Sequence, residues 1–201
     1  IDSCGICSEG DSGHTADSDI DSCGNCFGGV GDLDGDGVCD TEDSSPYGDI
    51  ILSFSNITEG SVRLDYSSDM PIYGFQFNVI GVVLTGLSSE FDFVDYGEEI
   101  GLALGLSMNG TSLSSGEGTL AELTFDATLD GFTLSLDNVL IGGQNGINIA
   151  VNGPEDALIP SCANGDSDLS CDVVDTWPAC SDTGSDPYDD CGVCNGGNAD
   201  Q

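Results

Sequence analysis

Carboxylate side chains recur at alternate positions in one short loop near the amino end of the chain. In the segment 32–43, acidic residues occupy positions 1, 3, 5, 9 and 12, and Gly37 occupies position 6. This spacing is typical of a calcium-binding loop, in which alternate side chains converge on one cation and the glycine permits a sharp turn. Without a cation, each close pair of carboxylates would cost about 1 kcal/mol even in water. The predicted ligands are Asp32, Asp34, Asp36, the carbonyl oxygen of Val38, Asp40 and Asp43.

A second segment, 164–175, carries oxygen-bearing side chains at the same five positions. Its sixth position holds Leu169 instead of glycine, so the match to a calcium loop is weaker and a solvated acidic turn is the alternative. Calcium prefers oxygen ligands and is therefore the cofactor predicted for both loops. The predicted ligands of the second loop are Asn164, Asp166, Asp168, Asp172 and Asp175.

A six-residue motif, Asp-x-Cys-Gly-x-Cys, occurs at 2–7, 21–26 and 189–194. A redox pair would need a helix amino terminus to lower the thiol pKa, and no helix is predicted after the motif. A zinc site fits the spacing of the first two copies, but the third copy has no second pair nearby. Because the total of ten cysteines is even, disulfide bonds are the favoured interpretation, and the sequence leaves their pairing open. The cysteines expected to form them are Cys4, Cys7, Cys23, Cys26, Cys39, Cys162, Cys171, Cys180, Cys191 and Cys194.

The charge balance excludes several classes of partner. The chain has one basic residue among Lys and Arg and 37 acidic residues, which gives a net charge of −36 at pH 7. Nucleic acids and anionic membranes both require clusters of basic side chains, so neither is an expected partner. The longest apolar stretch, around 79–87, is too short to span a bilayer, and membrane insertion is not expected.

The same sequence offers little for catalysis. Its single histidine, His14, lies in a segment rich in glycine, serine and aspartate, and the nucleophile motif of hydrolases and the zinc-protease motif are both missing. Glu98 and Glu99 are adjacent, and neighbouring residues of a strand point to opposite faces, so they do not form a glycosidase pair. We therefore expect a protein that is not an enzyme.

The cysteines divide the chain into three parts, because five precede residue 51, five follow residue 160 and none lies between. The central part alternates apolar and polar residues with a period of two, which is typical of an antiparallel β-sandwich. In one clear example, Phe75, Phe77 and Val79 share a face. A segment of this length can bury a core without disulfides. Strands are expected at 50–54, 61–66, 74–79, 102–106, 120–125, 132–136, 139–141 and 147–151.

The two flanking parts have few apolar residues, many glycines and strong like charge. Such a composition favours disorder, so disulfides, bound cations or neighbouring molecules must order them. The expected fold class is all-β, with irregular arms that disulfides and calcium stabilise at both ends. The expected parts are a Cys/Asp-rich calcium-binding arm at 1–49, an antiparallel β-sandwich at 50–160 and a second Cys/Asp-rich arm at 161–201.

Three sets of residues resemble known families. Segment 32–43 resembles a thrombospondin type 3 calcium repeat, and the cysteine motifs resemble the short Cys/Gly/Asp repeats of secreted bacterial proteins. The segments 74–79, 116–125 and 136–140 resemble the cohesin-like β-sandwich, a jelly roll, of bacterial surface and cellulosomal proteins. These resemblances imply calcium-bound, disulfide-linked spacers beside a cohesin-like module. Cohesins bind dockerin modules, but a dockerin follows each calcium loop with a helix, and 41–49 offers none.

Cysteine usage predicts an extracellular protein, secreted or on the cell surface. The sequons at Asn56 and Asn109 make these residues candidate glycosylation sites. Because the cysteine motif lies near both ends, one copy following another would continue the repeat. The expected function is therefore a structural subunit of a calcium-stabilised surface filament or fibre, a homopolymer assembled head to tail. The alternative is a cohesin-like or carbohydrate-binding adhesion module of a larger cell-surface protein, with glycans among its partners.

Overall fold

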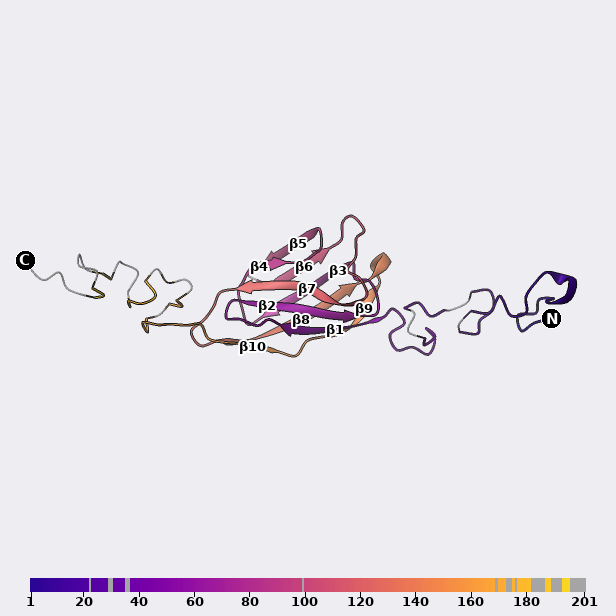
Figure 1. Cartoon of the computed structure of the whole chain (residues 1–201), viewed down its shortest axis with the longest axis horizontal. Coiled ribbons are helices and arrows are strands. Elements are labelled where there is room, and N and C mark those ends of the chain that lie inside the picture. The colour runs from indigo at the N-terminus through magenta and orange to yellow at the C-terminus, as the bar shows by residue number, and fades with distance from the viewer. Residues whose placement is uncertain are drawn as a thin grey trace, which may run out of the picture.

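Ten β-strands of the described part of the chain lie between Asp49 and Ile159 (Figure 1). The structure is a computed structural model that describes residues 1–21, 23–28, 31–34, 37–98, 100–168, 170–172, 175, 177–181, 187–188 and 193–195. The strands are β1 (Asp49–Ser55), β2 (Ser61–Ser68), β3 (Gly74–Ile80), β4 (Leu84–Ser88), β5 (Phe93–Gly97), β6 (Leu102–Leu106), β7 (Gly116–Phe125), β8 (Phe132–Gly142), β9 (Asn148–Asn152) and β10 (Ala157–Ile159). The all-β class predicted from the alternation is confirmed.

The strands form two layers that are connected through β9. Their pairing follows the order β4-β7-β2-β1-β9-β8-β3-β6-β5, and β10 adds to β8. The pairs within the described residues are antiparallel except for β1 with β9, which run parallel. In Figure 1 the layer of β7, β2 and β1 lies in front of the layer that contains β8 and β3. This arrangement is the predicted β-sandwich.

Alternate side chains of the strands meet between the two layers and form an apolar core. In β3, Phe75, Phe77 and Val79 are buried, whereas the intervening Gln76 and Asn78 are partly exposed. The rings of Phe75 and Phe77 stack with their centroids 5.2 Å apart. Each buried aromatic side chain contributes about 1.5–3 kcal/mol relative to an exposed one, so the core stabilises the sandwich without cross-links. Other fully buried residues of the core are Ile50, Val62, Leu64, Ile72, Leu84, Ala103, Leu120, Ala121, Leu123, Leu134 and Ile141.

The strand register places the two arms at opposite ends of the sandwich. The N-terminal arm enters at β1, whose first residues pair with β9. At that same end Asn148, where β9 begins, pairs with Gly142, where β8 finishes. The C-terminal arm leaves after Ile159, which pairs with Phe132 at the start of β8. Because β8 runs between these two points, the arms extend in opposite directions (Figure 1).

Strand β8 is a single strand of 11 residues where the alternation predicts two separate ones. Asn138 has a φ of 51°, and the register between β8 and β3 shifts at this point. The extra residue is a β-bulge, which resets the alternation so that Leu136 and Val139 both pack against the core. A bulge of this kind interrupts the period of two on which the prediction rests.

Three strands, β4, β5 and β10, lie outside the predicted ranges. Strands β4 and β5 are the two ends of the pairing order, and β10 has three residues. Each of them pairs with one neighbour among the described strands. Strand β4 contains a register shift between Leu84 and Gly86, and β5 begins with Phe93, which is 41% exposed. These irregularities, and the short length of β10, obscure the period of two in their sequences.

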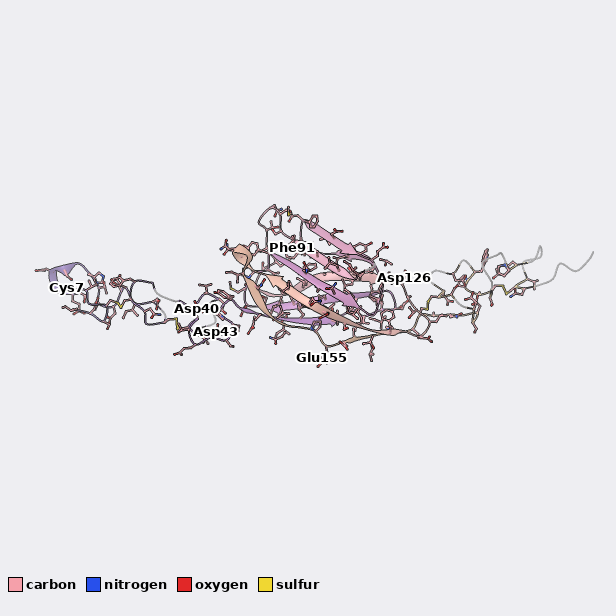
Figure 2. All side chains as sticks on the ribbon, turned by 180° about the vertical axis from the view of Figure 1, so that it is seen from behind. Cys7, Asp40, Asp43, Phe91, Asp126 and Glu155 are labelled. Carbon is pink, nitrogen blue, oxygen red and sulfur yellow. A yellow bond between two sulfur atoms is a disulfide. The ribbon has the colours of Figure 1, made fainter. Side chains whose placement is uncertain are left out.

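The arms consist of turns, isolated bridges and disulfides. Helical structure in the described residues is limited to two 3-10 turns, Gly10–Ser12 and Gln144–Gly146. Neither has the length or the apolar character that a membrane crossing requires. Figure 2 shows Cys7 toward the far end of the N-terminal arm, while Asp40 and Asp43 lie closer to the sandwich.

Replacing Phe77 with alanine tests the core. Phe77→Ala removes a fully buried ring that stacks on Phe75. We expect the free energy of unfolding to fall by about 3–5 kcal/mol in chemical denaturation followed by circular dichroism. Val83→Ala is the matched control, because Val83 is 57% exposed, and it should cost less than about 1 kcal/mol. Equal losses for the two variants would contradict the placement of the core.

Candidate metal sites and cysteine repeats

Three carboxylates of the C-terminal arm converge on one point. One oxygen from each of Asp166, Asp168 and Asp175 lies within 4.8 Å of the other two. The Oδ2 atoms of Asp166 and Asp175 are buried and accept no hydrogen bond. Buried oxygens of this kind are costly unless they are paired, and a cation between them would satisfy both. A set of oxygen ligands fits a hard divalent cation such as calcium.

The two remaining predicted ligands of this loop, Asn164 and Asp172, hold its backbone. The side-chain oxygen of Asn164 accepts the N–H of Ser167 at 2.7 Å, and its amide nitrogen donates to a loop carbonyl at 2.8 Å. Asp172 Oδ1 accepts the N–H of Gly165 at 2.8 Å. Ser167 has a φ of 64°, so this loop makes a left-handed turn although its sixth position is leucine. The structure thus brings three of the five predicted side chains together, while the other two form hydrogen bonds that stabilise the loop backbone.

The N-terminal loop has the same backbone framework as the C-terminal loop. In both loops the N–H of position 2, which is Leu33 or Gly165, donates to the carboxylate of position 9, which is Asp40 or Asp172, at 2.8 Å. The N–H of position 12 donates to the carbonyl of position 8 at 3.0 Å in both. The carboxylate of position 12 accepts the N–H two residues later, at 2.8 and 2.9 Å. Two different sequences therefore fold into one loop type, as their shared acidic spacing predicts.

Position 12 of the N-terminal loop is Asp43, whose Oδ2 is buried and accepts no hydrogen bond, like that of Asp175. Asp32 Oδ2 accepts the N–H of Gly37 at 3.0 Å, which places this glycine where the calcium-loop spacing requires it. Asp36 lies outside the described residues. Within the part that the structure describes, Asp34, Val38 and Asp40 are not gathered into a three-carboxylate cluster like the one in the C-terminal arm.

The first two copies of the cysteine motif form the same turn. In each, the Oδ1 of the leading aspartate, Asp2 or Asp21, accepts the N–H groups two and four residues later, at 2.8–3.1 Å. Gly5 and Gly24 both have a φ of 78°, a left-handed conformation that explains the glycine of the motif. Reasoning from the sequence included the aspartate in the motif but assigned a role to the cysteines alone. Its signal was the recurrence of aspartate two residues before the first cysteine in every copy.

Four disulfides cross-link the described parts of the two arms. The N-terminal arm holds Cys4–Cys26 and Cys23–Cys39. The Cα atoms of all four bridged pairs are 5.4–5.7 Å apart, which is normal for disulfides. A zinc site at the first two motifs would need these sulfurs as thiolates, so the zinc alternative does not fit this arm. The bridges of the C-terminal arm are Cys162–Cys171 and Cys180–Cys194.

Two of the ten cysteines expected in disulfides are not in these bridges. Cys7 is free and exposed, which corrects the expectation for this residue within a single chain. The physical reason is that the other four cysteines of this arm are bridged to one another, as Cys4–Cys26 and Cys23–Cys39. Cys191 lies outside the described residues.

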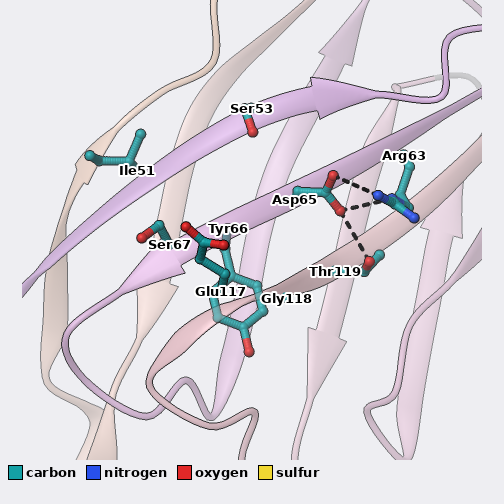
Figure 3. Close-up of a pocket in the computed structure, with 9 residues that line it drawn as sticks. All are labelled: Ile51, Ser53, Arg63, Asp65, Tyr66, Ser67, Glu117, Gly118 and Thr119. Atoms are coloured by element: carbon teal, nitrogen blue, oxygen red, sulfur yellow. Dashed lines mark hydrogen bonds and ion pairs between the residues drawn. The ribbon is translucent and has the colours of Figure 1, made fainter.

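Arg63 is the chain's single residue among Lys and Arg, and it is paired on the outer face of β2 (Figure 3). Its Nε lies 2.8 Å from Asp65 Oδ1, and Thr119 Oγ1 donates to the same oxygen at 3.0 Å. Burial raises the pKa of Asp65, but hydrogen bonds from Ser55, Arg63 and Thr119 outweigh it and hold the pKa below its ordinary value. A shallow cavity of about 450 Å³ lies beside the pair. The guanidinium is thus satisfied locally, as expected for a paired surface charge.

His14 ties together two acidic segments of the N-terminal arm. Its Nε2 lies 2.9 Å from Asp19 Oδ2, and its Nδ1 lies 3.7 Å from Asp2 Oδ2. The hydroxyl of Ser18 is 3.2 Å from the same Nε2 that contacts Asp19. Asp2 and Ser18 approach opposite ring nitrogens, but 3.7 Å from Nδ1 to Asp2 is too long for a hydrogen bond and Nε2 also contacts Asp19, so the three side chains are not linked as a hydrogen-bonded catalytic triad.

Both candidate glycosylation asparagines lie at exposed turns of the sandwich. Asn56 directly follows β1 and has a φ of 47°. The side-chain oxygen of Asn109 accepts the N–H and the hydroxyl of Thr111, at 2.9 and 2.8 Å. These sites remain predictions.

No protein-family model matches the chain, and no curated protein does. Among solved structures, the sandwich is similar to cohesin modules. A chain of a complex between a CaDoc0917 variant and CaCohA2 is 14% identical over 56% of this chain and 99% of that chain, with a TM-score of 0.45. A chain of the Coh-OlpC–Doc435 cohesin–dockerin complex from Clostridium thermocellum is 9% identical, with coverages of 58% and 95% and a TM-score of 0.43. The cohesin module of a Clostridium perfringens family 33 glycoside hydrolase is 16% identical, with coverages of 57% and 96% and a TM-score of 0.42.

The carboxylate of Asp2 makes the stability of the first turn of the N-terminal arm depend on pH. The hydrogen bond from the Ile6 N–H lowers the pKa of Asp2 below its ordinary 3.8, so the turn is stabilised above that pH and the stabilisation is lost as pH falls through the lowered pKa. We expect the NMR shift of the Ile6 amide proton to titrate with a midpoint below 3.8. In Asp2→Asn, which keeps the acceptor oxygen but cannot ionise, this titration should vanish. A wild-type midpoint above 3.8 would contradict the assigned hydrogen bonds.

Proposed function

We propose that this chain is an extracellular structural subunit, without enzymatic activity, that assembles head to tail into a calcium-stabilised fibre. The observation that carries the proposal is the exit of the two arms at opposite ends of the sandwich (Figure 1). Where the structure describes them, both arms lack an apolar core like that of the sandwich and are cross-linked by disulfides, which suits an oxidising, extracellular setting. Attachment segments at opposite ends let a subunit extend in a line, and a head-to-tail contact that does not close makes a fibre.

The parallel pairing of β1 with β9 supports a load-bearing role for the sandwich. Strand β1 follows the N-terminal arm directly, and β9 leads through β10 to the C-terminal arm. Tension on the arms pulls β1 at one end and β10, which is paired with β8, at the other, and beyond β10 it acts on β9 in the direction opposite to the pull on β1. The pairs from Asp49–Ala150 to Ile51–Asn152 then resist together rather than opening one at a time. The sandwich is therefore suited to transmit tension along its length.

Charge is the main obstacle to assembly, and calcium is the agent proposed to remove it. A net charge of −36 on each copy makes copies repel one another. Each bound calcium ion offsets two of these charges within an arm, where copies would meet. The buried oxygens of Asp43 and Asp175 without hydrogen-bond donors support one cation site in each arm.

Sedimentation velocity of the unreduced protein tests the proposal. In millimolar calcium we expect fast-sedimenting polymers, which should dissociate when calcium is chelated because the repulsion between arms is restored. A monomer under both conditions would contradict head-to-tail assembly. Polymers that survive chelation would contradict the proposed role of calcium.

Paired variants separate calcium binding from general charge effects. Asp43→Asn combined with Asp175→Asn keeps one acceptor oxygen at each site and removes the charged ligand. The calcium concentration needed for polymers should rise at least about tenfold, because cation affinity depends on the number of charged ligands. Asp156→Asn, at an exposed position between β9 and β10, is the control for a lost charge and should leave the requirement unchanged.

A second candidate function, an adhesion module that binds another protein or a glycan, is favoured by an apolar groove. The groove lies on the outer face of β3, β6 and β8 and has a volume of about 430 Å³. Leu106 and Leu140 line it with 38% and 51% of their surfaces exposed. Clusters of exposed leucine on a sheet face are typical of interaction surfaces.

Binding assays with the monomer test this second candidate. If the groove is the site, a panel of dockerin modules or glycans should yield a ligand whose binding is lost in Leu140→Asp. Ile51→Asp is the matched control, because Ile51 is 58% exposed on a strand of the other layer. Equal effects of the two substitutions would indicate that the groove is not the binding surface.

A further inference from the structure

We propose that the disulfide Cys162–Cys171 controls the affinity of the C-terminal loop for calcium, so that this loop binds the cation tightly only while the bridge is oxidised. The proposal rests on the calcium site proposed above and names its regulation. It follows from the place of Cys171 in the loop, at position 8 of the segment 164–175.

The backbone of the C-terminal loop is closed by hydrogen bonds at Cys171 and at the next residue. The carbonyl of Cys171 accepts the N–H of Asp175 at 3.0 Å. Asp172 donates its N–H to the carbonyl of Ala163 at 2.9 Å, and its Oδ1 accepts the N–H of Gly165 at 2.8 Å. The start of the loop and its last predicted ligand are therefore both held to positions 8 and 9.

The disulfide connects these two positions to the sandwich. Cys171 is bonded to Cys162, which lies nine residues earlier, and both cysteines are buried. Cys162 donates its N–H to the carbonyl of Thr128 at 3.0 Å, in the connection between β7 and β8. A covalent bond thus fixes the part of the loop on which its closing hydrogen bonds depend.

Asp175 is the candidate ligand that depends most directly on this arrangement. Its Oδ1 accepts the N–H of Trp177 at 2.9 Å, whereas its Oδ2 is buried and accepts no hydrogen bond. One of its oxygens lies within 4.8 Å of oxygens of Asp166 and Asp168. Because three carboxylates repel one another before a cation binds, the loop needs a restraint that keeps them close. The disulfide at Cys171 supplies that restraint.

The N-terminal loop contains the same connection. Its position 8 is Cys39, which is bonded to Cys23, a residue that also precedes its loop. The carbonyl of Cys39 accepts the N–H of Asp43 at 3.0 Å, and Asp40 donates its N–H to the carbonyl of Gly31 at 3.0 Å. Two loops of different sequence thus place a bridged cysteine at the same position and with the same hydrogen bonds. This recurrence indicates that the bridge is part of the loop framework.

Reduction of the bridge removes the restraint. In the reduced loop, calcium binding must also order the backbone between Cys162 and Cys171, and the entropy lost in that ordering lowers the affinity. Because coupling between two equilibria is reciprocal, bound calcium must favour the oxidised bridge by the same factor. In a reducing compartment the loop is therefore open and the charged arms repel, whereas in an oxidising one the bridge and the cation stabilise each other.

The bridge opens by thiol–disulfide exchange with a small thiol such as glutathione. A glutathione thiolate attacks one sulfur of the bridge, and one cysteine leaves as a thiolate. A second glutathione thiolate attacks the mixed disulfide, which releases the other cysteine thiolate and glutathione disulfide. The bridge gains two electrons, two glutathione thiols are oxidised to one disulfide, and their two protons pass to the cysteine thiolates.

Terbium luminescence measures the affinity of this loop directly, because terbium ions occupy oxygen-ligated calcium sites. Trp177, the single tryptophan of the chain, lies two residues after Asp175 and sensitises a terbium ion in the loop. In Cys162→Ser/Cys171→Ser the terbium concentration for half-maximal emission should rise at least about tenfold above that of the wild type. Excess calcium should abolish the wild-type emission, which identifies the site as a calcium site.

The double variant Cys180→Ser/Cys194→Ser is the matched control. It removes the other described bridge of the same arm, whose cysteines lie outside the segment 164–175. The terbium requirement should stay at the wild-type value in this control. An equal rise in the two double variants would show a general loosening of the arm and would overturn the inference, as would a wild-type affinity in both.

The reciprocal effect is measured on the wild-type chain, so it does not depend on the folding of a variant. The protein is equilibrated in glutathione redox buffers with and without calcium, free thiols are alkylated, and mass spectrometry follows each bridge. The equilibrium constant for reduction of Cys162–Cys171 should fall at least about tenfold in calcium. That of Cys180–Cys194 should not change. Equal shifts of the two bridges, or no shift of either, would overturn the inference.

Sedimentation of the same samples separates this inference from the proposed function. A wild-type chain that shows the coupling but stays monomeric in calcium would overturn head-to-tail assembly and leave the inference standing. Calcium-dependent polymers together with equal terbium affinities of the wild type and Cys162→Ser/Cys171→Ser would overturn the inference and leave assembly standing. Absence of a terbium signal that calcium displaces would overturn both the inference and the calcium site in this loop.

Discussion

A chain with a net charge of −36 folds only if its carboxylates find partners other than basic side chains. In the arms those partners are backbone N–H groups. Asp2 and Asp21 each accept two N–H bonds within one turn, and Asp40 and Asp172 each accept one across a loop. Because these bonds join residues close in sequence, they shape each turn without requiring a core. The acidic residues that would unfold the arms are thus the residues that give them structure.

Local turns do not by themselves define the path of an arm, and the disulfides supply the longer connections. The described bridges join residues 9 to 22 positions apart, so they connect one turn to the next rather than distant parts of the molecule. An arm built in this way is a series of short units, each held to its neighbour. Such a design extends in one direction, which agrees with the elongated outline in Figure 1.

The sandwich connects the two arms and, unlike them, is stabilised by the burial of apolar side chains. Its core is apolar and contains no cysteine, so its stability comes from burial rather than from cross-links. The parallel contact of β1 with β9 and the pairing of β10 with β8 fix where the chain enters and leaves. The molecule therefore combines a core that resists deformation with arms whose order depends on covalent bonds and hydrogen bonds to carboxylates. The proposed fibre uses both properties, since the sandwich transmits tension and the arms provide the contacts.

Much of this organisation was determined by the sequence alone. The period-two alternation around Phe75, Phe77 and Val79 predicts the inner strands, because burial of one face acts on every second residue. The acidic spacing predicts two calcium-type loops, and the structure gives both the same hydrogen bond from position 2 to the carboxylate of position 9. The strands β4, β5 and β10 and the bulge at Asn138 could not be predicted, because a register shift in β4, the exposed Phe93 in β5, the three-residue length of β10 and the inserted residue in β8 each obscure the period of two.

Only the tertiary structure decided which groups meet. The sequence left the cysteine pairing open, because any two thiols can bond once the fold brings their Cα atoms within about 4.4–6.8 Å. It also gave no reason to separate the candidate ligand side chains within the second loop. In the C-terminal loop the fold gathers Asp166, Asp168 and Asp175, whereas Asn164 and Asp172 brace the backbone. The directions of the arms likewise depend on strand register. Turns and strand alternation can be predicted from the sequence because they arise from residues close together in the chain. Contacts between distant residues form only when the chain folds, so they cannot be predicted from local patterns.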